Sequence, residues 1–326
     1  MDQIDLSLPK ISPSFPPKKS GQFLETLRGL KRDRFYYLLI ILPLLYFLVF
    51  RYLPMLGVVI AFQDYDPFLG IEGFWTSPWV GFTHFTNFIK SIFFWRIIGN
   101  TLIISGLKLL FGFPAPIILA LLLNEVRSTL FKRAVQNISY LPHFLSMVVV
   151  AGLVRSMLTV QGGLFNQIVR LFGGDPIAFL TYPEYFRGIL VGTTLWQEIG
   201  WGAILYLAAM STINIELYEA AAMDGANKFQ QALNITLPGI AYVIAIQLIF
   251  SIGGLLNAGF EQILLLYSPG VYGVADIIDT YVYRNGLLGR QYSFAAAVGL
   301  FKSLIALLLM VGANRVAKWV GQPGLW

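Results

Sequence analysis

Long, uninterrupted apolar segments dominate the pattern of hydrophobic and polar positions along the chain. A helix needs about 20 mainly apolar residues to cross the hydrocarbon core of a membrane. The strands of a membrane barrel would instead alternate between apolar and polar residues over about 10 positions, whereas the apolar runs here are continuous. The pattern therefore predicts an all-α, polytopic membrane protein with six transmembrane helices, at residues 35–60, 97–123, 141–158, 188–210, 239–256 and 293–316.

The composition agrees with a lipid environment. Of the 326 residues, 56% are hydrophobic and 12% are charged, whereas a soluble domain carries about 25% charged residues. A soluble chain of this composition would expose large apolar patches and aggregate. The chain has no cysteine and only two histidines, His84 and His143. We therefore expect no disulfide, no metal site and no catalytic residues.

Lysine and arginine are concentrated in residues 1–34, a proline-rich tail that carries seven of them. On the predicted topology, the segments on the side of this tail hold 13 lysines and arginines. The opposite loops, at residues 61–96, 159–187 and 257–292, hold six, and Arg155 just before the second loop brings the count on that side to seven. Because lysine and arginine favour the cytoplasmic side of a membrane, this bias predicts that both termini are cytoplasmic. The formal net charge of +6 is then a sign of membrane topology and not of nucleic-acid binding.

Aromatic side chains gather in the predicted outer loop 61–96, which includes Trp75, Trp79, Phe88 and Trp95. Tryptophan and tyrosine favour the membrane–water interface, so the loop is typical of an aromatic belt with a short amphipathic helix lying on the membrane. A docking surface for an extracytoplasmic partner is the alternative interpretation.

The predicted cytoplasmic segment between the fourth and fifth spans is longer than a connector requires. A minimal connection needs only a few residues, whereas this segment encodes two short helices. Asn214 can cap the first helix, and Asn227 can cap a second helix at residues 228–235. Gly225 separates the two because glycine readily adopts a left-handed backbone conformation. Pro238 is expected in the first turn of the fifth span.

Small residues in this segment, Ala220, Ala221, Gly225 and Ala226, would allow another surface to approach the backbone closely. Met223 adds an apolar anchor beside them. An amphipathic helix that rests on the inner leaflet has a similar pattern. By pattern alone, a protein-docking surface and a membrane-resting helix therefore remain equally open.

The same segment resembles a known sequence motif. Glu219-Ala220-Ala221, then Gly225, then Ile235-x-Leu237-Pro238, resembles the EAA motif of ABC importer permeases, with every element at the expected spacing. The resemblance covers about residues 35–320. Within the family, the chain is similar to the carbohydrate-uptake branch and, more narrowly, to the LplB-like permeases. The further motifs that carry it lie at residues 94–95, 100–101, 140–144, 162–166 and 196–202.

This resemblance implies the type I ABC importer permease fold. Its parts would be a cytoplasmic tail at 1–34, a first transmembrane helix with a periplasmic loop at 35–93, and a core transmembrane domain at 94–318. The core would contain a coupling segment at 212–237, which in this family docks on a separate ATPase. The resemblance implies that the coupling residues are Glu219, Ala220, Ala221, Asp224, Gly225, Ala226, Leu237 and Pro238.

The implied protein is a permease subunit in the inner membrane of a bacterium. With a second permease it would form a path for an oligosaccharide, with alginate as one candidate, that a periplasmic binding protein delivers. Two ATPase subunits would bind ATP and Mg²⁺, since this chain has no G-x-x-x-x-G-K-[ST] phosphate loop. The alternative is a secondary transporter driven by an ion gradient. Many transporters of that class are built from inverted repeats, and this sequence shows no clear internal repeat.

Three charged residues, Lys108, Glu198 and Lys302, fall near the middle of predicted spans. A charge at that depth costs about 2.5–3.5 kcal/mol on insertion scales, and such residues usually face a bundle interior or a wet cavity. They are consistent either with a structural salt bridge, such as Glu198 with Lys108 or Lys302, or with the lining of a translocation path. In the second span, Pro114 and Pro116 predict a kink.

Overall fold

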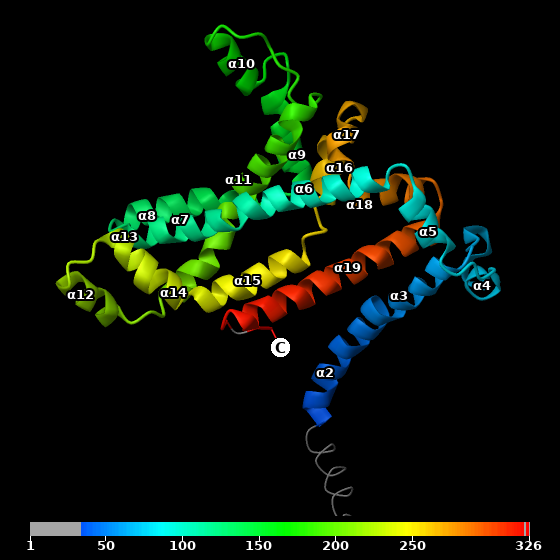
Figure 1. Cartoon of the computed structure of the whole chain (residues 1–326), viewed down its shortest axis with the longest axis horizontal. Helices are drawn as coiled ribbons and strands as arrows, with labels where there is room; N and C mark the ends of the chain where they lie inside the picture. The colour runs from blue at the N-terminus through cyan, green and yellow to red at the C-terminus, as the bar shows by residue number, and fades with distance from the viewer. Residues whose placement is uncertain (1–33, 323, 326) are drawn as a thin grey trace, which may run out of the picture. The chain divides into compact units, whose positions relative to one another are not determined.

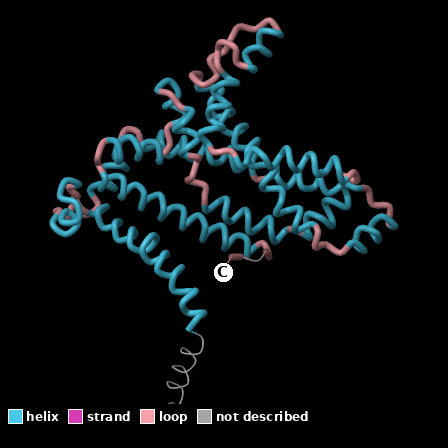
Figure 2. The backbone as a smooth tube through the Cα atoms, turned by 180° about the vertical axis from the view of Figure 1, so that it is seen from behind, coloured by secondary structure: helices cyan, strands magenta, loops and turns pink. Residues whose placement is uncertain are grey.

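The computed structural model describes residues 34–322 together with residues 324 and 325. The predicted cytoplasmic tail at 1–34 lies outside this part of the chain, except for Arg34. The described residues form helices joined by loops (Figure 2), and among them strand-like pairing is limited to one isolated bridge between Gln63 and Trp79. The prediction of a mainly helical protein is confirmed for the described residues.

The chain divides into two compact units, Met1–Gly57 and Val58–Trp326. The described part of the first unit contains α2 (Arg34–Phe47), followed by the π-helical segment η1 (Leu48–Tyr52) and α3 (Leu53–Met55). None of these segments has a buried side chain. A helix that is apolar all round is stable only when lipid or protein covers it.

Five long helices form the framework of the second unit (Figure 1). They are α6 (Phe94–Gly112), α7 (Pro114–Glu125), α11 (Pro183–Met210), α15 (Ala241–Gly253) and α19 (Tyr292–Trp319). Helix α11 packs against both α6 and α7, and α15 packs along α19. Helix α6 ends at Gly112 and α7 begins at Pro114, so the helix is interrupted where the sequence predicts a kink.

Shorter segments connect these helices. They are η2 (Leu56–Phe62), η3 (Pro67–Leu69), α4 (Gly70–Thr76), α5 (Thr83–Lys90), α8 (Thr129–Tyr140), η4 (Leu141–Phe144), α9 (Met147–Leu158), α10 (Leu164–Leu171), α12 (Ile215–Met223), α13 (Lys228–Gln231), η5 (Ala232–Thr236), α14 (Leu237–Gly239), α16 (Phe260–Leu266), η6 (Pro269–Val271), α17 (Tyr272–Ala275), α18 (Ile278–Val282) and η7 (Tyr283–Leu288).

By length and apolar composition, three to five helical stretches among the described residues can cross a membrane. Three single helices qualify: Arg34–Phe62, Phe94–Glu125 and Tyr292–Trp319. Two bent pairs qualify when each is counted as one span. Thr129–Phe144 with Met147–Leu158 bends by 104°, and Lys228–Gly239 with Ala241–Gly253 bends by 66°.

The third predicted span, 141–158, is therefore not one straight helix. Pro142 lies in η4, and the chain turns before Ser146 caps α9 by accepting a hydrogen bond from the Val149 N–H at 3.4 Å. Helix α11 covers the fourth predicted span, 188–210, but it is not among the helices that qualify by apolar composition. Six spans remain a prediction.

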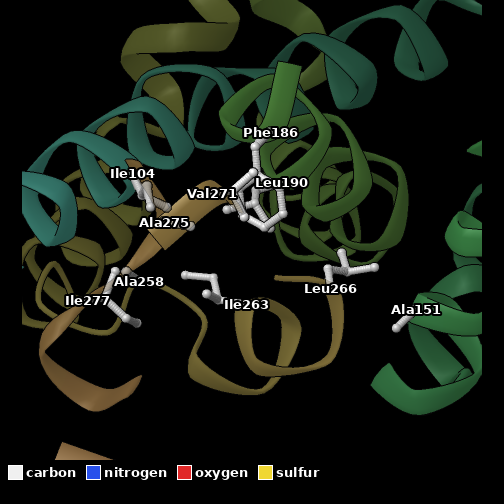
Figure 3. Close-up of a cluster of buried hydrophobic side chains, with 10 residues drawn as sticks. All are labelled: Ile104, Ala151, Phe186, Leu190, Ala258, Ile263, Leu266, Val271, Ala275 and Ile277. Carbon is white, nitrogen blue, oxygen red and sulfur yellow. The ribbon is translucent and has the colours of Figure 1, made fainter. Parts of the chain in front are cut away.

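The largest buried cluster joins α6, α9 and α11 to the segment 257–292, which the hydropathy pattern predicts as an outer loop. Figure 3 shows Phe186 and Leu190 of α11 in this cluster together with Ile263 and Leu266 of α16. The segment 257–292 is thus a set of short helices packed into the core and not a free loop. The hydropathy pattern misses this because each helix in the segment is too short to produce a long apolar run.

Candidate functional site

Helix α12 has the boundaries that its sequence predicts. The Asn214 Oδ1 atom accepts a hydrogen bond from the Glu216 N–H at 3.0 Å and so caps its start. At its end, Gly225 has φ +82°, the Gly225 N–H donates to Ala222 O at 3.1 Å, and the Ala226 N–H donates to Ala221 O at 2.9 Å. This pair of hydrogen bonds is a Schellman motif. The predicted cap and the predicted left-handed glycine are both confirmed.

The second helix of the segment starts as predicted and ends later. Asn227 and Gln230 form a reciprocal capping box, with hydrogen bonds of 2.9 and 2.8 Å. The helix then continues through α13, η5 and α14 to Gly239 and does not end at residue 235. Pro238 lies in its last turn, before the 66° bend. The prediction that Pro238 begins the fifth span is therefore wrong, since α15 begins at Ala241.

Polar contacts connect α12 to the long helices through this second helix. The hydroxyl groups of Tyr218 and Thr236 lie 2.9 Å apart. Lys228 Nζ lies 3.2 Å from Glu125 Oε2 at the end of α7. Because Lys228 is exposed, this ion pair contributes little stability, but it marks where the segment meets the bundle. A displacement of α12 can therefore reach α7 and α15 through one continuous helix.

The segment exposes large apolar side chains. No residue of α12 is buried. We define the coupling surface as four large apolar side chains whose exposed fractions are high for their type: Ile215 (69%), Leu217 (53%), Met223 (90%) and Phe229 (71%). Exposed apolar side chains that gather in this way mark a protein or membrane contact.

The predicted coupling residues divide into two groups. Glu219, Ala220, Asp224 and Gly225 are exposed on α12 and its C-terminal turn, with Ala221 and Ala226 half-buried beside them. Leu237 instead packs against the buried cluster that contains Ile240 and Tyr206, and Pro238 follows it in the same short helix. The two ends of the motif thus lie in different helices, one facing outward and one packed on the bundle.

A cavity of about 320 Å³ lies between α6, α11 and α15, and two of the predicted path residues, Lys108 and Glu198, line it. Lys302 does not. The other polar side chains on its wall include Thr194, Gln247 and Asn257. The structure therefore brings Lys108 and Glu198 to one space and separates them from Lys302.

Neither of the salt bridges considered as one alternative, Glu198 with Lys108 or with Lys302, is present. Glu198 Oε2 lies 3.0 Å from His143 Nδ1. Lys302 Nζ is paired with the two carboxylate oxygens of Asp279, at 2.7 and 2.8 Å. Asp279 lies in α18, outside the predicted spans, and His143 lies in η4, within the predicted third span; the sequence interpretation considered neither as a partner.

Lys108 binds neutral groups. Its Nζ donates to Ala258 O at 2.9 Å and to Gln262 Oε1 at 2.5 Å. Gln262 is buried, and its Nε2 donates to Leu190 O at 3.0 Å. Lys108 forms no ion pair among the described residues. Its positive charge is thus held in place by neutral acceptors at the wall of the cavity, where it can attract an anion.

The sequence prediction did not name two functional candidates, His143 and Trp201. His143 stacks on Trp201 with ring centroids 4.4 Å apart and an interplanar angle of 4°, and this pair holds Glu198 at the cavity. The motif at 140–144 marks the position of His143, but no sequence signal pairs it with α11.

Among the described residues, no group of three or more His, Cys, Asp or Glu side chains could hold a metal ion.

A buried polar network fixes the segment 257–292 to α6 and α11. Asn100 is buried, its Nδ2 donates to Gly273 O and Asp276 O at 3.1 Å each, and its Oδ1 accepts from Arg187 at 2.8 Å. Arg284 donates two hydrogen bonds to the Asp276 carboxylate, at 2.9 and 2.7 Å. Asn100 belongs to the motif at 100–101, so that motif has a structural role.

Comparison with known proteins gives a family match and close relatives. Residues 112–322 match the family described as binding-protein-dependent transport system inner membrane component. Protein LplB of Bacillus subtilis (strain 168) is 48% identical over 311 residues, which cover 95% of this chain and 97% of that protein. The polygalacturonan/rhamnogalacturonan transport system permease protein YteP of the same organism is 48% identical over 295 residues, covering 90% of this chain and 91% of YteP.

Two solved structures are similar in fold and sequence. One is a chain from a bacterial ABC transporter involved in the import of the acidic polysaccharide alginate. It has a TM-score of 0.84 and 44% identity, and the match covers 91% of this chain and 99% of that chain. The other is a bacterial alginate ABC transporter in complex with an alginate pentasaccharide-bound periplasmic protein. Its TM-score is 0.84, its identity is 43%, and the coverage is the same.

Proposed function

The chain belongs to the family of inner membrane components of binding-protein-dependent transport systems, and from this membership we propose that it takes up force from separate ATPases through the coupling surface. It is the permease subunit of an ABC importer for a sugar and not an enzyme. The family match favours this function over a secondary transporter driven by an ion gradient.

The observation that carries the coupling proposal is the construction of α12. The helix has a cap at each end and no buried residue, and its large apolar side chains Ile215, Leu217 and Met223 are exposed. A membrane-resting helix would not need the rigid turn at Gly225 or the continuous second helix that leads to α15. In this proposal the partner ATPases bind ATP and Mg²⁺, and Glu219, Ala220, Ala221, Asp224, Gly225 and Ala226 meet them. Leu237 and Pro238 transmit the movement to the bundle.

The proposed topology has six spans, with both termini in the cytoplasm. Five are the three single helices and the two bent pairs. The sixth is α11, which has 28 residues and is long enough to cross. Two of its polar residues, Thr194 and Glu198, line the cavity that also contains Lys108, which in part explains a composition less apolar than that of the other spans. Helices α12 and α5 lie at opposite ends of the long helices (Figure 1), in agreement with a cytoplasmic and a periplasmic end.

The proposed cargo is an acidic oligosaccharide delivered by a periplasmic binding protein, with alginate as one candidate. The relatives support a polysaccharide fragment, since alginate is named for one and polygalacturonan for another. Lys108 supports an acidic one, because it is a cation without a carboxylate partner among the described residues and it lines the cavity. The path would be completed by a second permease. The domain boundaries at 1–34, 35–93 and 94–318 are part of this proposal.

The coupling proposal is tested by placing a carboxylate on the coupling surface. Met223→Asp and Phe229→Asp should abolish copurification of the ATPases, since burying one such side chain is worth about 1.5–3 kcal/mol, more than a tenfold change in affinity. Phe172→Asp is the matched control, because Phe172 is exposed to the same degree as Met223 but lies at the end of α10. If both coupling-surface variants retain the ATPases at wild-type levels, α12 is not the docking site.

A further inference from the structure

A second cavity, of about 770 Å³, lies at the end of the long helices where α5 is found. One wall comes from residues 64–65 and from α5 with the residues that follow it, and the other comes from residues 281–294, between η7 and α19. Phe88 fixes α5 in place, because it is buried against Phe94 and Phe301 with ring centroids 5.1 and 5.7 Å away. Neither the coupling surface nor the translocation path uses this cavity.

The cavity has an excess of positive charge. Lys90 and Arg290 line it together with a single acid, Asp64, and all three are exposed. Neither Lys90 nor Arg290 forms an ion pair within the described part of the chain. The Arg290 guanidinium instead lies 6.0 Å from the centre of the Phe68 ring. Two unpaired cations on one cavity attract an anion.

The backbone of Arg290 is strained. With φ 58°, it is the only residue other than glycine that has a positive φ among the described residues. Hydrogen bonds from the Gly289 N–H to Arg284 O at 3.0 Å and from the Arg290 N–H to Leu287 O at 3.3 Å hold this turn. A glycine would adopt the same conformation without strain. Strain of this kind clusters at ligand sites, and here it holds a guanidinium at the cavity.

The neutral lining suits a phosphate group. Asn87, Asn285 and Gln291 contribute amides, and Tyr281 and Ser91 contribute hydroxyl groups. These groups can donate hydrogen bonds to phosphate oxygens beside the two cations, and hydrogen bonds to a charged acceptor are the stronger kind.

Apolar side chains surround this end of the bundle. Trp75, Phe82, Ile92 and Trp95 are all well exposed, and Ile92 also lines the cavity. Large exposed aromatic side chains in a membrane protein lie at the level of the lipid headgroups. The cavity is therefore at the depth where a phospholipid presents its phosphate, and the apolar side chains beside it can contact acyl chains.

We propose that this cavity binds the headgroup of an anionic phospholipid, with its phosphate held by Lys90 and Arg290. A free phosphate ion has the same charge chemistry, and an acidic saccharide would use the same cations. The apolar surroundings favour the lipid, because of the three ligands only a lipid has acyl chains to pack against them.

The test measures lipid bound to the full chain, purified in the complex that it forms and stripped of lipid in detergent. Native mass spectrometry with added phosphatidylglycerol should show about fivefold weaker binding for Lys90→Gln or Arg290→Gln, and about 25-fold weaker binding for both together, if each interfacial cation contributes as is usual. Arg170→Gln is the matched control, because Arg170 is an exposed arginine on α10 that does not line the cavity.

Arg290→Gly separates binding from folding. This variant removes the cation and relieves the backbone strain, so it should keep or raise the thermal stability of the protein while it weakens lipid binding about fivefold. Wild-type lipid binding in the Lys90→Gln/Arg290→Gln variant would overturn the proposal. So would binding of inorganic phosphate alone with the same dependence on Lys90 and Arg290. Displacement of the lipid by a uronate oligosaccharide that depends on these two residues would identify a saccharide site instead.

Discussion

Gly225 provides a sharp test of force transmission, because a side chain placed there meets no other described atom of this chain. Its φ is +82°, and a Cβ atom built on it would meet nothing within 4 Å. Within this chain a side chain at this position therefore creates no clash, and the cost that remains is that of the left-handed conformation. That cost is roughly 1–2 kcal/mol for most residues, smaller for asparagine, and larger for β-branched residues.

The size of this cost is enough to release α12. A change of about 1–2 kcal/mol shifts an equilibrium by a factor of about 5–30. The hydrogen bond between Tyr218 and Thr236, at 2.9 Å, contributes only about 1 kcal/mol net, so it cannot hold α12 in place when the turn is strained. We expect ATP-driven uptake to decrease in the order Gly225, Gly225→Asn, Gly225→Ala, Gly225→Val.

The assay is uptake and ATP hydrolysis measured in parallel on the complex reconstituted in liposomes. Gly173→Val is the matched control, since Gly173 ends α10 in the same Schellman motif, with φ +78° and no atom within 4 Å of a Cβ. Both valine variants should insert in the membrane, and only Gly225→Val should lose the coupling between hydrolysis and uptake. Uptake in Gly225→Val equal to that in Gly173→Val would refute the role of this turn.

Two further predictions concern the charges inside the bundle. Lys302→Met or Asp279→Asn should lower thermal stability by about 1.5–3 kcal/mol, the usual value of a hydrogen bond to a charged group, because each leaves one partly buried charge unpaired. The double variant should recover part of this loss in melting experiments, and additive losses would contradict the pairing. Lys108→Met should reduce uptake of an acidic oligosaccharide while ATPase copurification stays at the wild-type level, and unchanged uptake would remove Lys108 from the path.

The short helices of the coupling segment could be predicted in detail, because their determinants are local. Asn214, Gly225 and Asn227 act on hydrogen bonds within a few residues of themselves, so their spacing in the chain fixes the geometry. The end of the second helix could not be predicted. Pro238 permits both a helix start and a last turn, and the observed bend after Gly239 depends on how Ile240 is buried in the bundle.

The spans, too, include features that could be predicted from the sequence and features that could not. Continuous apolar runs were sufficient for α6, α7 and α19, whose hydropathy is high. For α11 the run at 188–210 also located the helix, although this helix includes polar residues where it lines a cavity. The helices of the segment 257–292 left no apolar run, although Ile263 and Leu266 are fully buried.

The sequence by itself determined that this chain is a helical membrane protein, where its long apolar segments lie, and which residues form the EAA motif. These features depend on transfer of apolar side chains from water and on bonds between near neighbours in the chain. Only the tertiary structure decided which charges meet. Among the described residues, Lys302 pairs with Asp279, Glu198 meets His143, and Lys108 binds only neutral groups. An ion pair forms between side chains brought within about 4 Å, and that proximity is set by how α11, α18 and α19 pack and not by distance along the chain.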